Sequence, residues 1–353
     1  MYPDIRKILE AATMAPSGEN AQPWKFIVRG NVIELFNLPH RNDSLYGWGQ
    51  RASYMANGAV LENIVIAASQ FGYNCHIEIF PNSREPELVA KIDLDKGMPI
   101  KDFLYDYIFE RITNRKPYEI RPFSISEEKK FQSAIKIKET KIYFTQKEHH
   151  KKILGRVGSA NEVIMLSNKH LHKYFFSHIN WTKDEDDKKK IGFFIETLEL
   201  PFPSKIGFKV IKHWPIAKIL HKIGFHKMVG NQNAAVNSLT GGFGAITIPN
   251  NSRENFVLAG RTLQRIWLTA TGLNLSMQPL TGILFFMHKV IAGETDKFTP
   301  IHVKIIKEAY KDIENAFDIK NNEVVSFMFR IGYGGKPSAR SSRFLVDDVV
   351  DLK

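Results

Sequence analysis

The chain has 353 residues, of which 43% are hydrophobic and 24% charged, and its formal net charge is +12. These proportions are typical of a folded globular protein and exclude a fibrous or largely disordered chain. No apolar run approaches the ~18 residues needed to cross a bilayer, and the first residues lack the apolar core of a signal peptide. The single cysteine, Cys75, excludes an internal disulfide and a CxxC site, so we expect a cytoplasmic protein.

The positive charge is concentrated in one part of the chain. Between Glu199 and Glu254 there is no acidic residue, whereas lysines recur throughout. Within this stretch, PIAKILHKIGFHKM (residues 215–228) predicts a helix with Ile216, Ile219, Leu220 and Ile223 on one face. Our preferred interpretation is an amphipathic helix packed on the body of the protein, and the alternative is a helix lying on a membrane surface. A second basic region, 129–152, is also without a nucleic-acid-binding signature, so no nucleic-acid partner is expected.

Hydrophobic periodicity and turn residues predict the elements of the first third of the chain. The predicted order is a helix over 3–13, strands over 24–28 and 32–36 joined at Gly30-Asn31, a helix over 55–71, strands over 75–80 and 88–94, and a helix over 103–111. The helix over 55–71 is almost entirely apolar and ends at Gly72, so we expect it to be buried.

The rest of the chain predicts more helix than strand. The expected order is a helix over 126–138 capped by Ser126, a strand over 141–145, a mostly helical region to about 200, a loop-rich segment over 201–240, a strand over 245–248, a helix from Ser252 to about 271, and a strand over 324–331. A tail rich in Gly, Ser, Pro and Arg follows, and FLVDDVV at its end has enough apolar residues to pack.

Two buried-type helices share a short pattern. LENIVIAA (61–68) and LQRIWLTA (263–270) are each followed by a glycine and a short apolar strand. Eight aligned positions are weak evidence for a repeat, because apolar helices resemble one another by chance. A duplication would nevertheless explain the length as two copies of a dimeric fold rather than two unrelated domains.

Three segments could carry chemistry. In APSGENAQPW (15–24), Ser17, Asn20 and Gln22 offer compact donors and acceptors beside Trp24, which suits a planar heterocycle, although an ordinary turn has the same composition. In RITNRKP (111–117), Arg111, Thr113 and Arg115 fall on one face of an extended segment, which suits a phosphate, although a solvated basic turn is the alternative. In GYGGKPSARSSRF (332–344), basic residues follow a glycine-rich stretch that is otherwise typical of a disordered terminus.

Other familiar motifs are absent. The glycines of GGFG (241–244) precede a predicted strand instead of following one, so they do not form a dinucleotide-binding turn. The chain contains no GxSxG or HExxH motif, and its histidine pairs lie in lysine-rich surroundings without carboxylate clusters. We therefore expect neither a nucleophilic triad nor a bound metal.

Together the three segments resemble the nitroreductase family of FMN-binding oxidoreductases. APSGENAQPW looks like that family's APSxxNxQPW loop, and RITNRKP is similar to its Arg-x-Ser-x-Arg motif, with Thr113 in place of Ser. The resemblance covers nearly the whole chain and is closest to the long, single-chain Acg-like subgroup. It implies an α+β, nitroreductase-like fold in which two fused copies form an intramolecular pseudo-dimer, with mixed sheets flanked by helices.

The departures from the family pattern imply a single site. The resemblance divides the chain into a truncated first copy, 1–98, and a second copy, 99–353, with a helical or lid insertion over about 145–240. The first copy has the APS loop but no Arg-x-Ser-x-Arg motif, and the second has RITNRKP but no APS loop. Because the family builds each flavin site from both motifs across its dimer interface, one complete site and one FMN per chain are expected.

The resemblance also implies roles for individual residues. Arg111, Arg343 and Arg340 would bind the phosphate, Thr113 the ribityl-phosphate end, and Arg115 the pyrimidine edge of the flavin. Ser17, Asn20 and Gln22 would contact the flavin from the other copy. The MQPLT loop (277–281), including Pro279 and Leu280, would approach the flavin N5 edge through its backbone. No side chain is expected to act as a catalytic nucleophile, because the cofactor carries the hydride chemistry.

The implied activity is hydride transfer from NADH or NADPH through FMN to a small electrophilic acceptor such as a nitroaromatic or a quinone, by a monomer acting as a pseudo-dimer. The segment His178–Leu200 would form a lid or substrate wall with 201–240, or else a surface helical hairpin. Two alternatives stay open: a protein that holds FMN with little turnover, and a basic protein associated with a membrane or a nucleic acid.

Overall fold

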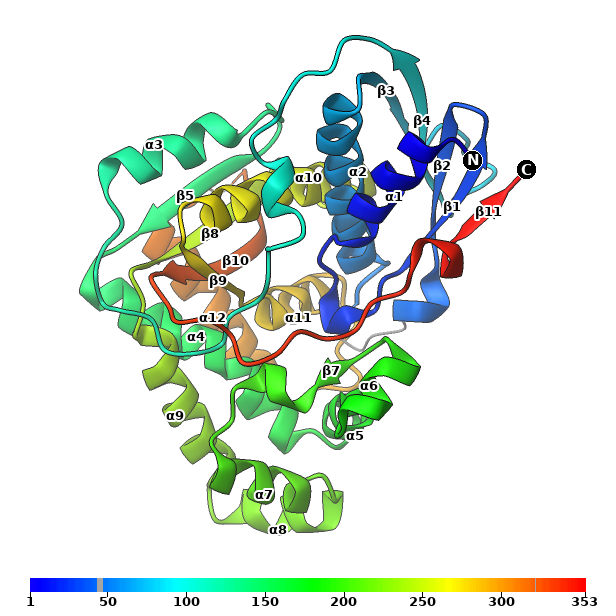
Figure 1. Cartoon of the computed structure of the whole chain (residues 1–353). Coiled ribbons are helices and arrows are strands. Elements are labelled where there is room, and N and C mark those ends of the chain that lie inside the picture. Colours follow the sequence, from blue (N-terminus) through cyan, green and yellow to red (C-terminus); the bar gives the residue numbers. More distant parts are fainter. Residues whose placement is uncertain (43–46, 321) are drawn as a thin grey trace.

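Two β-sheets lie on either side of a pair of long helices in the computed structural model, which describes residues 1–42, 47–320 and 322–353 (Figure 1). Helices and strands are interspersed along the chain and both sheets contain antiparallel pairs, so the expected α+β class is confirmed. Within the described ranges, no helix is both long and apolar enough to span a bilayer.

The first sheet is mixed and has the strand order β11-β1-β2-β4-β3. The four N-terminal strands pair antiparallel, whereas β11 pairs parallel to β1 with Val350 opposite Phe26. Alternate residues of β1 and β2, among them Trp24 and Ile33, enter a core shared with α1 and α2. The bounds are α1 Pro3–Thr13, β1 Trp24–Arg29, β2 Val32–Asn37, α2 Arg51–Gln70, β3 Tyr73–Ile79, β4 Leu88–Lys96 and β11 Val350–Leu352.

The second sheet is antiparallel and has the order β5-β8-β10-β9. Its strand β8 is buried along its whole length, and a Cβ on Gly244 would lie 2.3 Å from the ring of Phe329 in the facing strand. The glycines of GGFG therefore allow close packing within this sheet. The bounds are α3 Ile125–Ala134, β5 Lys141–Thr145, β8 Gly242–Ile248, α10 Arg253–Gly272, β9 Ser276–Pro279, α11 Gly282–Ile291, α12 Pro300–Phe317 and β10 Val324–Gly332.

A largely helical insertion joins β5 to β8, as predicted for the part up to about residue 200. The prediction of a loop-rich segment over 201–240 is wrong, because three helices fill most of it. Its residues form a separate apolar cluster with α11 and α12. Figure 1 shows α7 and α8 at one end of the molecule, far from the first sheet. The bounds are α4 Glu148–Ser167, α5 Lys169–Ser177, β6 Ile179–Asn180, α6 Lys183–Lys189, β7 Phe193–Phe194, α7 Phe202–Ile211, α8 Trp214–Lys222 and α9 Phe225–Ser238.

The helices α2 and α10 cross at two glycines. A Cβ on Gly58 would lie 2.0 Å from the carbonyl oxygen of Val257, and one on Gly260 would lie 1.9 Å from that of Met55. In the register that aligns LENIVIAA with LQRIWLTA, Gly58 corresponds to Gly260 and Met55 to Val257. Each helix therefore presents the same position to the other, as in an isologous contact between two identical subunits.

Polar contacts beside the crossing repeat this reciprocity. Glu62, which is 2% exposed, accepts from Arg265 Nη1 at 2.8 Å, while Gln264 Nε2 donates to Asn63 Oδ1 at 2.6 Å. In the same register Glu62 corresponds to Gln264 and Asn63 to Arg265. The buried carboxylate also accepts from Arg261 Nε at 2.8 Å, so its charge is paired on two sides.

The C-terminal tail crosses from the second sheet to the first. After β10 it runs past the APSGENAQPW loop and ends as β11 at the edge of the first sheet (Figure 1). Val346 and Val349 are buried, which confirms that FLVDDVV packs and excludes a disordered terminus.

Three predicted helices need correction. Only a short 3-10 turn, Tyr105–Tyr107, forms within 103–111, and the carbonyls of residues 109–111 accept from the Arg340 guanidinium. The helix α3 ends at Ala134 and its N-cap is Ser124, whose side chain forms a capping box with Glu127, so the prediction of Ser126 is wrong.

The basic helix predicted over 215–228 is also interrupted. It breaks into α8 and α9 at Gly224, whose φ of +82° belongs to the left-handed region that glycine tolerates. The predicted packing of its apolar face is wrong as well, since Ile219 and Ile223 are exposed.

Candidate functional site

Three arginines from distant parts of the chain converge beside the C-terminal end of α1. Arg111 Nη2 donates to the carbonyl of Met14 at 2.8 Å, and Arg343 Nη1 donates to those of Thr13 and Ala15 at 3.0 and 2.7 Å. Arg340 donates to the carbonyls of residues 109–111 at 2.7–3.0 Å. The partial negative charge at a helix C-terminus favours cations there, and these contacts hold the guanidiniums without neutralising them.

The cluster has no acidic counter-charge in the part of the chain that the structure describes. Among the ion pairs of the described residues, none includes Arg111, Arg340 or Arg343. Arg111 is 4% exposed, and its Nε has no hydrogen-bond partner within the described part of the chain. Burial, together with the neighbouring guanidiniums, lowers the pKa of Arg111 well below its usual range and that of Arg343 to about 10.

This arrangement fits a bound phosphate. An anion would pair with guanidiniums that now meet only neutral carbonyls, and the Arg111 Nε–H has no other acceptor among the described residues. Trp267 of α10 lies against the same side chain, with the guanidinium carbon 4.7 Å from the ring centroid. The central helix thus fixes the position of Arg111.

RITNRKP lies next to the MQPLT loop, as expected of one site. Thr113 forms an isolated bridge with Met277, and the Asn114 N–H donates to the Met277 carbonyl at 3.2 Å. Pro279 and Leu280 stand at the end of β9, where the Leu280 N–H donates to the Met328 carbonyl at 2.8 Å. That N–H is therefore used within the protein and does not point at a ligand.

Arg115 faces the insertion instead of the three-arginine cluster. Its Nη1 donates to the Thr197 carbonyl at 2.9 Å, and its guanidinium lies 5.5 Å from the ring centroid of Phe193. Burial lowers its pKa to about 10, with Arg330 adding to the effect and Tyr118 and Glu199 opposing it. Arg115 is thus a second cation beside the site, held under the segment that leads to α7.

The polar residues of APSGENAQPW mainly hold neighbouring segments in place. Ser17 Oγ accepts from the Gln22 N–H at 2.9 Å. Asn20 Nδ2 donates to the carbonyls of Lys190 and Ser342, and Gln22 Nε2 donates to that of Lys190 at 2.6 Å. Gln22 Oε1 accepts from the Phe344 N–H at 3.0 Å. The amides of Asn20 and Gln22 therefore join the loop to the insertion and to the tail.

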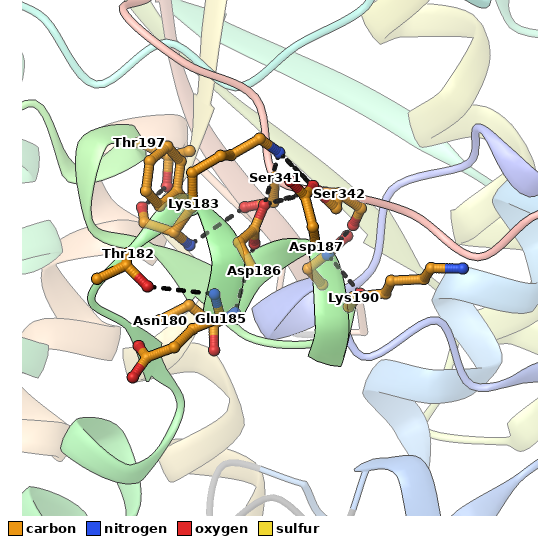
Figure 2. Close-up of polar contacts among 12 residues, drawn as sticks. Asn180, Thr182, Lys183, Glu185, Asp186, Asp187, Lys190, Thr197, Ser341 and Ser342 are labelled. Carbon is orange, nitrogen blue, oxygen red and sulfur yellow. Dashed lines mark hydrogen bonds and ion pairs between the residues drawn. The ribbon is translucent and has the colours of Figure 1, made fainter.

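A network around Asp186 attaches the insertion to the tail between Arg340 and Arg343 (Figure 2). Asp186 is fully buried, and its Oδ2 accepts from both the N–H and the Oγ of Ser342 at 2.8 Å. Lys183 Nζ donates to Ser342 Oγ at 2.8 Å, and the Phe194 N–H donates to Ser341 Oγ at 3.3 Å. The insertion is thus fastened directly over the basic tail.

Sequence reasoning missed the residues that assemble the site. Asn114 donates to Ser276 Oγ at 2.9 Å and to the Gly335 carbonyl at 2.5 Å, joining three segments, but one Asn in a basic turn gives no such signal. Asp186 lies in KDEDDKK, which is typical of a solvated helix. The position of Trp267 could have been inferred only from the packing of α10.

Comparisons with known proteins agree with the motifs. No family model matches the chain. It is 29% identical over 121 residues to "Putative NAD(P)H nitroreductase acg" of Mycobacterium tuberculosis, which covers 33% of this chain and 37% of that protein. It is 20% identical over 346 residues to an uncharacterized protein of the same species, covering 97% of this chain and 47% of the relative. These matches span well under two thirds of either relative.

A solved structure extends the likeness to the fold. The crystal structure of "a putative nitroreductase" from Anabaena variabilis superposes with a TM-score of 0.50 at 11% identity, covering 94% of this chain and 88% of the other. The chain therefore has a nitroreductase-like fold. The resemblance to the Acg-like proteins, predicted from the APS loop and RITNRKP, is confirmed by the sequence similarity to acg.

Proposed function

We propose that this chain binds one FMN and works as an NAD(P)H-dependent oxidoreductase that reduces a small electrophilic acceptor, such as a nitroaromatic or a quinone. The observation that carries the proposal is the cluster of Arg111, Arg340 and Arg343 at the junction of the APS loop and the tail, where no described residue is its acidic partner. A phosphate monoester would supply the negative charge and the hydrogen-bond acceptors that these guanidiniums can pair with.

Individual residues would hold and tune the cofactor. Arg111 and Arg343 would bind the phosphate, with Arg340 adding positive charge and fixing the backbone of residues 109–111. Thr113 would face the ribityl end, and Arg115 would place positive charge near the flavin ring. When bound, FMN supplies the hydride chemistry that no side chain in the site offers. The name of the acg relative, an NAD(P)H nitroreductase, supports a nicotinamide donor.

We further propose that the chain is an intramolecular pseudo-dimer, with copies over 1–98 and 99–353 and the insertion over about 145–240. The reciprocal contacts of Gly58 with Val257 and of Gly260 with Met55 support this symmetry. The copies differ in what they contribute, since the APS loop comes from the first and RITNRKP from the second. Only one junction therefore has the donor set for a flavin phosphate.

The test is steady-state oxidation of NADH and NADPH by the FMN-loaded protein, with a nitroaromatic and a quinone as acceptors. We expect at least one nucleotide to be oxidised in an acceptor-dependent manner. A protein that binds no FMN would contradict the proposal as a whole. A parallel anaerobic titration follows the flavin absorbance as each nucleotide is added.

A second candidate function is the storage or sequestration of FMN. The closure of the insertion over the site favours it, because Asn20, Gln22 and Ser342 all bind the insertion and its contacts would hinder a nicotinamide. In that case FMN binds, yet neither nucleotide reduces it in the anaerobic titration. The two functions therefore give opposite results in one experiment.

A further inference from the structure

The hairpin formed by α7 and α8 exposes an apolar surface that the body of the protein leaves uncovered. On α7 the exposed side chains are Phe202, Ile206 and Val210, which are four residues apart and share one helical face. On α8 they are Ile216 and Ile219, and Ile223 follows at its C-cap, so that the three are three and four residues apart. Exposed fractions reach 76% for Phe202 and 77% for Ile223.

The hairpin is anchored by its opposite face. Phe208 of α7 packs at a tilt against Phe176 with ring centroids 4.8 Å apart, and Ile211 is buried. On α8, Ala217 is buried, and Trp214 packs edge-on against His172 at 5.2 Å. The outer apolar residues are therefore not needed for the internal packing of the hairpin.

Unpaired positive charge surrounds the apolar rows. No acidic residue occurs between Glu199 and Glu254. Lys205 pairs with Glu196, but no ion pair of the described residues includes the other lysines of this region, which are all exposed: Lys209, Lys212, Lys218, Lys222 and Lys227. Lysines of this kind bury their methylene stems along an apolar surface and keep the ammonium group at its polar boundary.

We propose that α7 and α8 dock on the anionic surface of a lipid bilayer, with Phe202, Ile206, Ile219 and Ile223 inserted at the headgroup level and the lysines facing the lipid phosphates. Apolar rows flanked by cations are the two features that bind an interfacial helix to acidic lipid. The hairpin lies at an end of the molecule away from both chain termini, so a flat surface can reach it (Figure 1).

Charge and composition favour a bilayer over other partners. A symmetric contact with a second copy would bring two lysine-rich surfaces together without any acid from 200–253 to neutralise them. A nucleic acid would pair with the lysines but would leave the aliphatic row of Ile206, Val210 and Ile219 in water, because it binds proteins through phosphates and stacked bases. A bilayer surface accommodates both features together.

The experiment is co-sedimentation of the full chain with phosphatidylcholine vesicles and with vesicles that also contain phosphatidylglycerol, at low and high salt. We expect binding only to the anionic vesicles, weakened by salt. Two double variants should each lower the partition coefficient at least about tenfold: Phe202→Ser with Ile219→Ser removes apolar anchors, and Lys218→Glu with Lys222→Glu reverses charge.

Matched controls test whether the loss of binding is specific to this surface, or follows from changing any exposed apolar residue or any lysine. Met98→Ser with Ile100→Ser changes exposed apolar residues elsewhere, and Lys129→Glu with Lys130→Glu reverses charge on α3. Both should bind vesicles like the wild type, and thermal unfolding should be unchanged in all four variants. Wild-type levels of binding by the hairpin variants, or no binding to anionic vesicles, would overturn the proposal. The proposal would also be overturned if the wild type dimerises in sedimentation velocity and only the hairpin variants lose this, which would favour a second copy as the partner. Binding to a labelled oligonucleotide that only the hairpin variants lose would overturn it in favour of a nucleic acid.

Discussion

At the scale of single residues, the main feature of the site is three guanidiniums in surroundings of low polarity. Arg111, Arg340 and Arg343 each donate to main-chain carbonyls and have no carboxylate partner among the described residues, so their positive charge is positioned but not compensated there. Without an anion nearby, burial of these neighbouring guanidiniums disfavours their charged form, as their lowered pKa values indicate. Binding of a phosphate would relieve this repulsion, and so the cluster links stability to ligand binding.

Replacing either of two arginines should weaken FMN binding. Arg111→Ala or Arg343→Ala removes a charge-assisted contact of roughly 1.5–3 kcal/mol, which is about a tenfold or larger loss of affinity. Fluorescence titration of the apoprotein measures it. Arg121→Ala is the control, because Arg121 is exposed and stacks on Tyr333 away from the cluster. Unchanged affinity in both site variants would contradict the assignment of the phosphate site.

Glu162 gives the stability of the protein a pH dependence. Its Oε2 is buried without a hydrogen-bond partner among the described residues, and burial raises its pKa from 4.5 to about 7. Because the folded state then holds this proton more tightly than the unfolded chain, the free energy of unfolding should fall between about pH 4.5 and 7 and level off above.

The substitution Glu162→Gln should remove that dependence. We expect the variant to be more stable than the wild type above pH 7 by about 1–3 kcal/mol, with little difference near pH 4.5. Urea unfolding across this pH range measures the change. A wild-type stability that rises in parallel with that of the variant over the range would contradict a buried carboxyl with a raised pKa.

At the scale of elements, the crossing of α2 and α10 depends on close backbone approach. Gly58→Ala or Gly260→Ala would place a Cβ about 2 Å from a carbonyl oxygen of the other helix, so the helices would have to separate. We expect the free energy of unfolding to fall by about 2–4 kcal/mol in each variant. Gly207→Ala, on α7 with open space around it, is the control and should be neutral or slightly stabilising.

The contact between α6 and the tail should control access to the site. Asp186→Ala leaves the half-buried Ser342 N–H without its acceptor, which should lower stability by about 1–3 kcal/mol and loosen residues 180–200. We expect faster limited proteolysis there and faster dissociation of FMN, measured by stopped-flow fluorescence. Asp184→Ala removes only an exposed ion pair with Lys188 and should change neither rate. Equal rates in the two variants would show that this contact does not hold the insertion closed.

Periodicity in the sequence predicts most elements correctly but not how they are joined. The buried helix at 55–71 and the strands beside it follow from runs of apolar residues, and the APS loop and RITNRKP follow from composition and spacing. Where the predicted helix over 103–111 is lost, residues 109–111 are held by Arg340, some 230 residues away in the chain. The exposure of Ile219 depends on how much surface the body leaves uncovered. Such long-range contacts have no local signal.

At the scale of the whole molecule, the proposed pseudo-dimer would have two unequal halves. The reciprocal glycine crossing maintains the symmetry at the centre, whereas the insertion and the tail lie over one side of it. The C-terminal strand β11 pairs with β1 of the first sheet, which would join the two halves at a second place. A single cofactor site follows if each half supplies one of the two motifs.

The number of FMN molecules per chain tests this arrangement most directly. Protein loaded with excess FMN and freed of unbound flavin should show a flavin absorbance that corresponds to one FMN per chain. In sedimentation velocity, the loaded protein should be a monomer, so that the site is complete within one chain. Two FMN per chain would contradict the single site, and a protein that binds no FMN would contradict the site itself.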